Sequence, residues 1–390
     1  MRNGFQVGRI FGINIRIDWS WLLIFLLISW NLSVVFGQAH PNWGLGESWL
    51  VAIIAALLFF ISVLLHELAH SVMARIQGVP VRSITLFLFG GVSNIEREPP
   101  SPNAEFLITV VGPATSIVLG GLFTWIGLTT AGQATVGLSA PNVISRLDPL
   151  TTLLLWLGPI NLILGVFNLI PGFPLDGGRL LRSILWAATN SLEQATQWAA
   201  GVGQVIAWLF IIAGVAMIFG VQIPFLGGGF INGIWLAFIG WFLSSAASQS
   251  YQQVLMQDLL DGVSVSRLMR TNPPTVEPDC TLNDLVDNHI LQHDDQAFPV
   301  VEGDELVGLV TLDDIRQVAR QQWDVTTVRQ IMTPEAKLVL TTPEENADEA
   351  LHKLSQQDVR QLPVVHGHHL LGLLRRNDIV RWLQIQGAHS

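Results

Sequence analysis

Charged side chains are scarce in this sequence. Asp, Glu, Lys and Arg make up 13% of the 390 residues, hydrophobic residues make up 50%, and the mean hydropathy is +0.47. Such a composition excludes an ordinary soluble protein and predicts a membrane protein with a soluble part attached. The net charge of −10 lies wholly in residues 251–390, since residues 1–250 carry 9 basic and 9 acidic side chains. This acidic part lacks the basic patches that nucleic-acid binding requires, so we expect no nucleic-acid partner.

Cysteine is nearly absent, since Cys280 is the only one. A single cysteine excludes an internal disulfide framework, and it also excludes a zinc site built from several cysteines. Any zinc ion in this protein would therefore depend on histidines and carboxylates. We expect Cys280 itself to be a small core residue rather than a nucleophile, because that is the commoner role of a lone cysteine.

Long apolar runs, in contrast, are abundant. Six runs of about 20 residues predict membrane-spanning helices at approximately 19–36, 49–74, 104–130, 149–170, 198–220 and 229–247. Nearly all arginines of the first 250 residues fall on one side of these spans, and Arg146 alone falls on the other. By the positive-inside rule, the N-terminus and the C-terminal part both face the cytoplasm. We therefore expect an integral, multi-pass protein of a cell (plasma) membrane.

The second predicted span carries two histidines and a glutamate in the sequence ISVLLHELAHSVMARI, namely His66, Glu67 and His70. The histidines are four residues apart, so on a helix they lie on one face about one turn apart. This HExxH pattern is typical of a site in which two imidazoles hold one zinc ion and a carboxylate takes a proton from bound water. Ionisable groups in a membrane helix are costly and usually functional, which favours a zinc site over accidental spacing.

The fourth predicted span runs into an irregular stretch, Asn168–Leu185, with the sequence NLIPGFPLDGGRLLRSIL. Its two prolines and three glycines cannot all lie in a regular helix. Broken backbone at membrane depth survives only where it is buried in protein or lines a cavity. Asp176 lies in this stretch, and a zinc ion on His66 and His70 is the obvious cation for it, which would give three protein ligands plus water. Alternatively, Asp176 caps a helix that begins at Gly177.

Two stretches outside the spans have the pattern of extended chain. The isoleucines of Ile13–Ile17 alternate with polar residues, which predicts a short strand. Val81–Glu96, between the second and third spans, contains a strand-like run and the turn signal Gly90-Gly91. An apolar hairpin there would be interfacial or re-entrant and could present a strand edge to an extended peptide. A simple connecting loop explains Val81–Glu96 equally well.

The combination of HELAH in the second span with N-x-x-P-x-x-P-L-D-G-G in the fourth resembles the site-2 protease family (peptidase M50) of intramembrane zinc metalloproteases. The resemblance implies that His66, His70 and Asp176 hold one zinc ion and that Glu67 is the catalytic base. It also implies that Asn168 positions the substrate or the transition state. Gly112-Pro113 in the third span and the hairpin with its Gly-Gly turn are similar to the family as well.

The C-terminal third is an internal duplication with a period of about 64 residues. Ala297–Ile315 (AFPVVEGDELVGLVTLDDI) pairs with Gln361–Ile379 (QLPVVHGHHLLGLLRRNDI). Each unit is predicted to form a strand, a helix, two strands joined by a turn, and a second helix. The duplication resembles a tandem pair of CBS domains, a family whose role is often adenine-nucleotide sensing and dimerisation.

This second resemblance implies nucleotide contacts in the first repeat, where Thr311 would meet phosphate and Asp314 the ribose hydroxyls. In the second repeat Asp378 remains, but Arg375 replaces the threonine. An arginine can still pair with phosphate, so we expect ATP, ADP or AMP in one cleft and leave the other open. A purely structural pair that binds nothing remains an equal alternative. Three histidines of the second repeat align with a turn of the first, which favours an exposed hairpin turn over a second metal site: His366, His368 and His369.

Together these patterns predict a polytopic α-helical membrane protein of about six spans, with a short membrane-associated β-hairpin or sheet, plus a cytoplasmic α/β tandem CBS module. The predicted parts are a metalloprotease domain at 1–247, a linker at 248–262, and CBS domains at 263–322 and 323–386.

The predicted function is hydrolysis of a peptide bond within or near the transmembrane segment of a membrane-anchored substrate. The resemblance implies single-span substrates within the lipid bilayer, such as membrane-anchored anti-sigma factors, together with regulation and homodimerisation through the CBS pair. The alternative is a CBS-gated transporter of zinc or another ion, since transporters also use broken helices and mid-membrane carboxylates. Glu67 counts against transport. A transporter needs ligands that release the metal, whereas an HExxH pattern with a third carboxylate is suited to holding it. An inactive scaffold that binds membrane helices is a third hypothesis, and the intact ligands and base argue against it.

Overall fold

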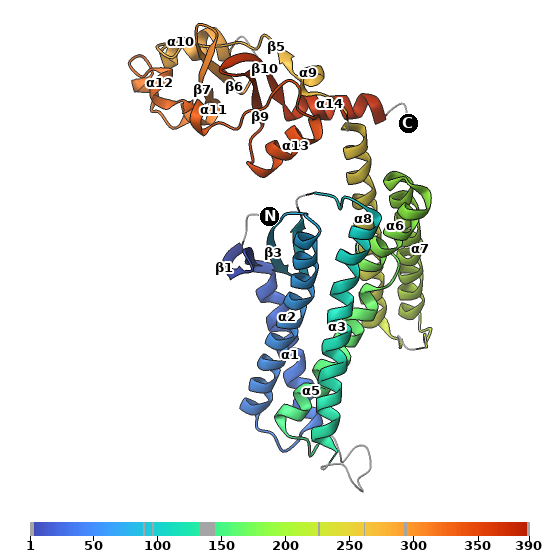
Figure 1. The fold of residues 1–390 in the computed structure, drawn as a ribbon. Coiled ribbons are helices and arrows are strands. Elements are labelled where there is room, and N and C mark those ends of the chain that lie inside the picture. The colour runs from blue at the N-terminus through green and yellow to red at the C-terminus, as the bar shows by residue number, and fades with distance from the viewer. Residues whose placement is uncertain are drawn as a thin grey trace. The chain divides into compact units, whose positions relative to one another are not determined.

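The computed structural model describes residues 4–88, 90–95, 97–132, 145–224, 227–260, 262–291 and 295–387. The chain divides into two compact units, Met1–Gln252 and Gln253–Ser390 (Figure 1). The first unit is built mainly of long helices, and the second combines short helices with a sheet. This is the predicted fold class, a polytopic helical membrane protein joined to an α/β module.

Within the described ranges, six helices are long and apolar enough to cross a membrane. They match the six predicted spans and support a multi-pass membrane protein: α1 (Trp19–Ala39), α2 (Leu45–Ile76), α3 (Pro102–Ala131), α5 (Pro149–Asn168), α7 (Leu192–Ile218) and α8 (Phe230–Leu260). The apolar part of α8 ends at Gln249, but the helix continues, so most of the predicted linker is helical. Leu260 near the end of that linker is buried in the core of the second unit.

Glycines let α3 and α5 approach one another closely. A Cβ at Gly158 of α5 would lie 2.2 Å from Thr124 Oγ1 of α3, and a Cβ at Gly165 would lie 2.7 Å from Ile117 Cγ1. Small residues have this role in membrane helices, where close van der Waals packing replaces the hydrophobic effect as the force between helices. Since α3 also contacts α2, it links the helix with the HExxH pattern to the fourth span (Figure 1).

A four-stranded sheet flanks the first two spans in sequence. Its order is β1-β2-β3-β4, with β2 and β3 parallel and the other neighbours antiparallel: β1 (Gly4–Ile10), β2 (Ile13–Asp18), β3 (Val81–Phe87) and β4 (Gly90–Ile95). The predicted strand and the predicted hairpin are thus both present, and the simple-loop alternative is wrong. Phe89 and Glu96 of the hairpin lie outside the described residues. Among the described strands, β4 forms one edge of the sheet and β1, which we did not predict, forms the other.

The fourth span is followed by broken backbone, as predicted. α5 ends at Asn168, and after an irregular loop the short helix α6 (Asp176–Thr189) begins. A Cβ at Gly177 would lie 2.2 Å from the carbonyl oxygen of Ile170, and one at Gly178 would lie 2.4 Å from the backbone nitrogen of Phe173. Only glycine fits at these two positions, so the Gly-Gly pair allows the loop to fold tightly against the start of α6.

The second unit contains one sheet to which both repeats contribute. Its path is β5-β10-β7-β6, while β9 pairs with β10 and β8 with β7. The first repeat contains α9 (Val265–Leu268), β5 (Arg270–Thr271), α10 (Leu282–Leu285), η1 (Val286–Ile290), β6 (Ala297–Glu302), β7 (Glu305–Thr311), α11 (Leu312–Arg316) and η2 (Arg320–Gln322). The second contains α12 (Val328–Ile331), β8 (Thr333–Pro334), η3 (Glu335–Lys337), α13 (Ala347–Gln356), β9 (Gln361–His366), β10 (His369–Arg375) and α14 (Arg376–Gly387). Because β5 pairs with β10 and β8 with β7, the repeats exchange their first strands.

Two smaller predictions concern this unit. The three clustered histidines are exposed around the β9–β10 turn, which confirms the hairpin-turn interpretation. Cys280 packs against the core of the first repeat, and burial raises the pKa of its thiol. A raised pKa disfavours the thiolate, so Cys280 has the properties of a core residue and not of a nucleophile.

Candidate metal centre

Three predicted ligand residues meet in the first unit. His66 and His70 lie on one face of α2, and Asp176 is the first residue of α6. The two Nε2 atoms are 3.2 Å apart, and Asp176 Oδ2 lies 3.1 Å from each of them. In the part of the chain that the structure describes, this His-His-Asp cluster is the only group of three or more His, Cys, Asp or Glu side chains that could hold a metal ion.

The geometry of the His-His-Asp cluster suits zinc. Tetrahedral zinc with ligand bonds of roughly 2.0–2.1 Å requires its ligand atoms to lie roughly 3.3 Å apart, close to the separations found here. His70 Nδ1 is 2.7 Å from the carbonyl oxygen of Ile108, so Nδ1 carries the proton and the Nε2 lone pair faces the cluster. His66 Nδ1 is 2.9 Å from Ser116 Oγ. Outer hydrogen bonds of this kind orient metal-binding histidines, so two imidazoles and a carboxylate are preset for one ion.

The alternative role of Asp176 as a helix cap is wrong. The N-cap position of α6 is Leu175, and no side chain caps the helix there. The Asp176 carboxylate is directed instead to the two histidines, and its side chain is only 15% exposed.

Glu67 lies beside the His-His-Asp cluster, and strand β4 holds the Glu67 side chain in place. Ser93 Oγ lies 2.7 Å from Glu67 Oε2, within hydrogen-bond reach of the carboxylate, and Ser71 Oγ donates to Ser93 Oγ at 3.1 Å. A Cβ at Gly91 would lie 2.4 Å from Glu67 Cγ, so β4 can approach this close only with glycine at that position. Sequence reasoning missed Ser93, although it lies in the predicted hairpin.

One face of α3 supports the cluster. Ile108, Gly112 and Ser116 recur every four residues, so they lie on the same side of the helix. Ile108 and Ser116 bond the two histidines, and a Cβ at Gly112 would lie 2.0 Å from His70 Nε2. The predicted Gly112 therefore leaves the space that the imidazole occupies. Nothing in the sequence pattern alone pointed to Ile108, because it contributes its backbone carbonyl.

Asn168 is not joined to the His-His-Asp cluster by a hydrogen bond that the structure records. It is the last residue of α5, half-buried, and its Nδ2 donates to the carbonyl oxygen of Leu164 at 2.9 Å. Its role in positioning substrate therefore stays a prediction.

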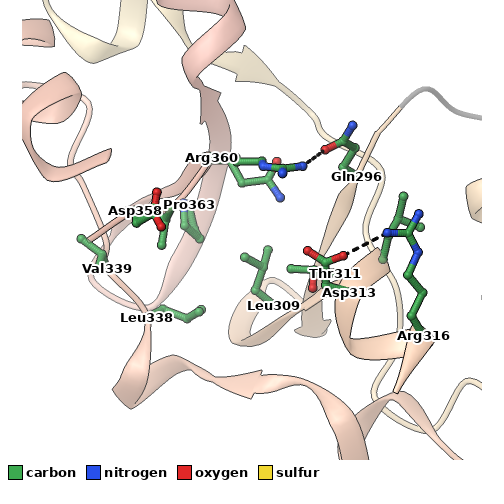
Figure 2. Close-up of a pocket in the computed structure, with 13 residues that line it drawn as sticks. Gln296, Leu309, Thr311, Asp313, Arg316, Leu338, Val339, Asp358, Arg360 and Pro363 are labelled. Atoms are coloured by element: carbon green, nitrogen blue, oxygen red, sulfur yellow. Dashed lines mark hydrogen bonds and ion pairs between the residues drawn. The ribbon is translucent and has the colours of Figure 1, made fainter. Parts of the chain in front are cut away.

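The second unit contains a cleft of about 290 Å³ between the repeats (Figure 2). Thr311, Asp313 and Arg316 line it from the first repeat, and Val339 and Arg360 line it from the second. The predicted contact Thr311 thus faces the cleft. Asp314 is not among the lining residues, and its carboxylate accepts a hydrogen bond from the Thr311 hydroxyl at 2.6 Å in the capping box of α11.

The corresponding position of the second repeat is occupied by an ion-pair network. Arg375 donates from Nε and Nη2 to the two oxygens of Asp378 at 2.9 and 2.8 Å, and from Nη1 to Asp295 at 2.8 Å. The hydrogen bonds with Asp378 raise the pKa of Arg375. Arg270 binds the other oxygen of Asp295 at 2.7 Å. The predicted contact Asp378 is therefore engaged within the protein, and the two repeats are not equivalent.

Comparison with known proteins places these features in a family. The model of peptidase family M50 matches residues 54–212, and the CBS domain model matches residues 265–320 and 328–385. The chain is 35% identical over 387 residues to "Putative zinc metalloprotease Rip3" of Mycobacterium tuberculosis, covering 99% of this chain and 94% of the relative. It is 33% identical over 398 residues to "Putative zinc metalloprotease sll0528" of Synechocystis, covering 100% and 97%. Among solved structures, the site-2 protease of Methanocaldococcus jannaschii is 28% identical with a TM-score of 0.42, covering 64% of this chain and 95% of that chain.

Proposed function

This chain belongs to peptidase family M50, the site-2-protease-like zinc metalloproteases, and on that premise we propose that it cleaves single-span membrane proteins within or near their transmembrane segments. The observation that carries the proposal is the His-His-Asp cluster with Glu67 beside it, in a unit whose helices are apolar enough to span a bilayer. A protease that works at this depth acts on a substrate that lies in the same membrane.

Each residue of the site has a different role in the proposed hydrolysis. His66, His70 and Asp176 would hold a zinc ion, which would supply Lewis acidity and lower the pKa of a bound water. Glu67 accepts the proton of the attacking water and delivers it to the nitrogen of the leaving amine. Ser93 orients the Glu67 carboxylate for this transfer. We assign to Asn168 a hydrogen bond to the oxyanion that develops on the scissile carbonyl.

Strand β4 is the proposed docking edge for the substrate. A helical substrate hides its carbonyl groups in its own hydrogen bonds, so it must unwind before a water can attack. β4 ends the described sheet and touches Glu67 through Ser93, so a peptide added to this edge lies next to the base. The chemistry fits any single-span membrane protein with an easily unwound segment, and membrane-anchored anti-sigma factors are one class of this kind.

The CBS pair is the proposed regulatory part. The cleft that contains Thr311 is the proposed site for one adenine nucleotide, ATP, ADP or AMP, and Arg375 is already paired in the other repeat. Contacts between CBS pairs would give a homodimer. The arginine distribution supports a cytoplasmic location for the N-terminus and for the CBS pair.

The test combines zinc content with cleavage of a single-span reporter by detergent-purified protein. Wild type is expected to carry one zinc per chain and to cleave. Glu67→Gln is expected to keep the zinc and lose cleavage, whereas Asp176→Ala loses both. Absence of zinc from wild type, or full cleavage by Glu67→Gln, would contradict the proposal. If wild type holds zinc without cleaving, the reaction is repeated with ATP and with AMP, and cleavage in either arm supports nucleotide control.

A further inference from the structure

A buried ion-pair network lies close to the His-His-Asp cluster, and the catalytic mechanism does not use it. Arg182 of α6 donates from Nε to Glu105 Oε1 at 2.7 Å and from Nη2 to Glu98 Oε2 at 2.9 Å. The side chains of Arg182 and Glu105 are 5% and 0% exposed. The guanidinium also lies 5.7 Å from the ring centre of Phe173.

Such a network is an expensive way to hold two helices together. Removing two charges from water is energetically costly, and well-packed apolar side chains of similar volume often give equal or greater stability. What an arginine adds is direction, because its planar N–H groups donate to carboxylate oxygens only in a fixed arrangement. The network is therefore better explained by the geometry it imposes than by the stability it adds.

The single guanidinium of Arg182 joins segments that carry the parts of the metal centre. Glu105 precedes Ile108 by one turn of α3, and the Ile108 carbonyl orients His70. Phe173 lies in the loop that leads to Asp176, and Arg182 is in the same helix as Asp176. Together these contacts help to set the distance between α6, which carries Asp176, and the two histidines.

Glu98 adds a connection to the proposed docking edge. It lies three residues beyond the end of β4, the strand whose Ser93 holds Glu67. No side chain caps the first turn of α6, which is held by the tight packing of its Gly-Gly pair against the preceding loop. The position of Asp176 also depends on contacts made further along α6, and among these the ion pairs of the buried Arg182 reach both α3 and the segment after β4.

We propose that Arg182 is a positioning residue that holds Asp176 against His66 and His70 and links this ligand to β4 through Glu98. Arg182 touches neither metal nor substrate, so it acts through Asp176 and not as a catalytic residue. This inference rests on the metal centre of the proposed function.

The deciding experiment measures zinc affinity of the detergent-purified full chain by competition with a chelator, which needs no protease activity. Arg182→Met replaces the guanidinium by an apolar chain, and its zinc affinity should fall about 10–100-fold, as for other residues that orient metal ligands. Arg182→Lys keeps the charge without the fork and should recover part of the loss. The matched control is Arg97→Met, which removes an exposed arginine next to Glu98 and should bind zinc as wild type does.

Thermal unfolding separates positioning from folding. If Arg182→Met does not fold, Glu98→Gln decides, because Glu98 is 31% exposed and its amide keeps the shape of the side chain. Glu98→Gln should fold, keep wild-type zinc affinity and lower kcat with little change in KM, because it loosens only the link to β4. A folded Arg182→Met with wild-type zinc affinity, or Glu98→Gln with wild-type kcat, overturns this inference and leaves the proposed function standing. Wild type without zinc overturns both.

Discussion

Each unit of this protein holds an arginine between two carboxylates, and the two settings differ in burial. Arg182 and Glu105 of the membrane unit are 5% and 0% exposed, whereas Arg375 and Asp295 of the second unit are 30% and 3% exposed. A charge pair that water reaches is screened and contributes little, while breaking a fully buried pair leaves an uncompensated charge. The same chemistry should therefore control function in the first unit and adjust local stability in the second.

The glycine contacts differ between the units in the same way. In the membrane unit they bring helices and β4 against catalytic side chains, as at Gly91 and Gly112. In the second unit Gly308 and Gly372 allow the exchanged strands to pair, since a Cβ would meet Met332 in one case and Arg270 in the other. Changes of one methyl group should therefore affect catalysis in the first unit and only packing in the second.

The largest effect that tests this contrast is expected at Gly91. Gly91→Ala places a methyl group 2.4 Å from Glu67 Cγ, so the base or β4 must shift. A displacement of about 1 Å in a catalytic group can cost about 100-fold in rate, and kcat should fall by this order while zinc stays bound. Gly121→Ala in α3 is the matched control, because a Cβ there meets nothing within 4 Å. Equal cleavage rates for both variants would show that β4 does not fix Glu67.

A second effect is expected at Arg375. Arg375→Ala leaves the buried Asp295 with Arg270 as its remaining partner among the ion pairs described, and one side of Asp378 becomes unpaired. Loss of one partner of a buried polar group costs about 1–3 kcal/mol, so hydrogen exchange in β10 of the full chain should accelerate accordingly. Arg329→Ala is the comparison, because its pair with Glu302 is 48% and 52% exposed, so water screens it and its loss should change stability little. A larger effect at Arg329 than at Arg375 would refute the argument from burial.

A third prediction separates the two repeats. Thr311→Val removes the hydroxyl of a residue that lines the cleft, together with its hydrogen bond to Asp314, and AMP affinity should fall about tenfold for the loss of one hydrogen bond to a charged group. Arg375→Ala should leave AMP affinity unchanged, because Arg375 is paired internally and does not line the cleft of Figure 2. Calorimetry on the full chain measures both. Equal losses in the two variants would mean that the repeats bind alike.

The smallest effect is expected at His368, on an exposed turn of the second unit. The hydrogen bond with Glu335 raises the pKa of His368 above its ordinary value of 6.5. The charged form is the one stabilised in the folded protein, so the contribution is present below pH 6.5 and disappears as the pH rises through the raised pKa. His368→Gln should slightly lower the melting temperature of the second unit at low pH and leave it unchanged at high pH. A difference that grows with pH would have the wrong sign.

Several features could be predicted because they depend on neighbouring residues alone. An apolar run long enough to cross a bilayer must satisfy its backbone as a helix, which makes six spans visible in hydropathy. The spacing of His66 and His70 places them on one helix face without knowledge of the rest. The position of the hairpin at the edge of a sheet could not be predicted. It depends on β2, which is far away in the sequence and pairs in parallel with β3.

The amino-acid sequence alone determined the six spans, the HExxH helix, the broken stretch after the fourth span and the duplicated C-terminal module, because each is a local pattern of period, length or repetition. Only the tertiary structure decided that Asp176 meets the two histidines and does not cap a helix, that Ser93 holds Glu67, and that Arg182 pairs with Glu105. Local spacing sets which face of its own helix a side chain occupies. Close packing between helices and strands decides which of their faces meet. In this protein glycines allow that packing, and their role becomes visible only when their neighbours are known.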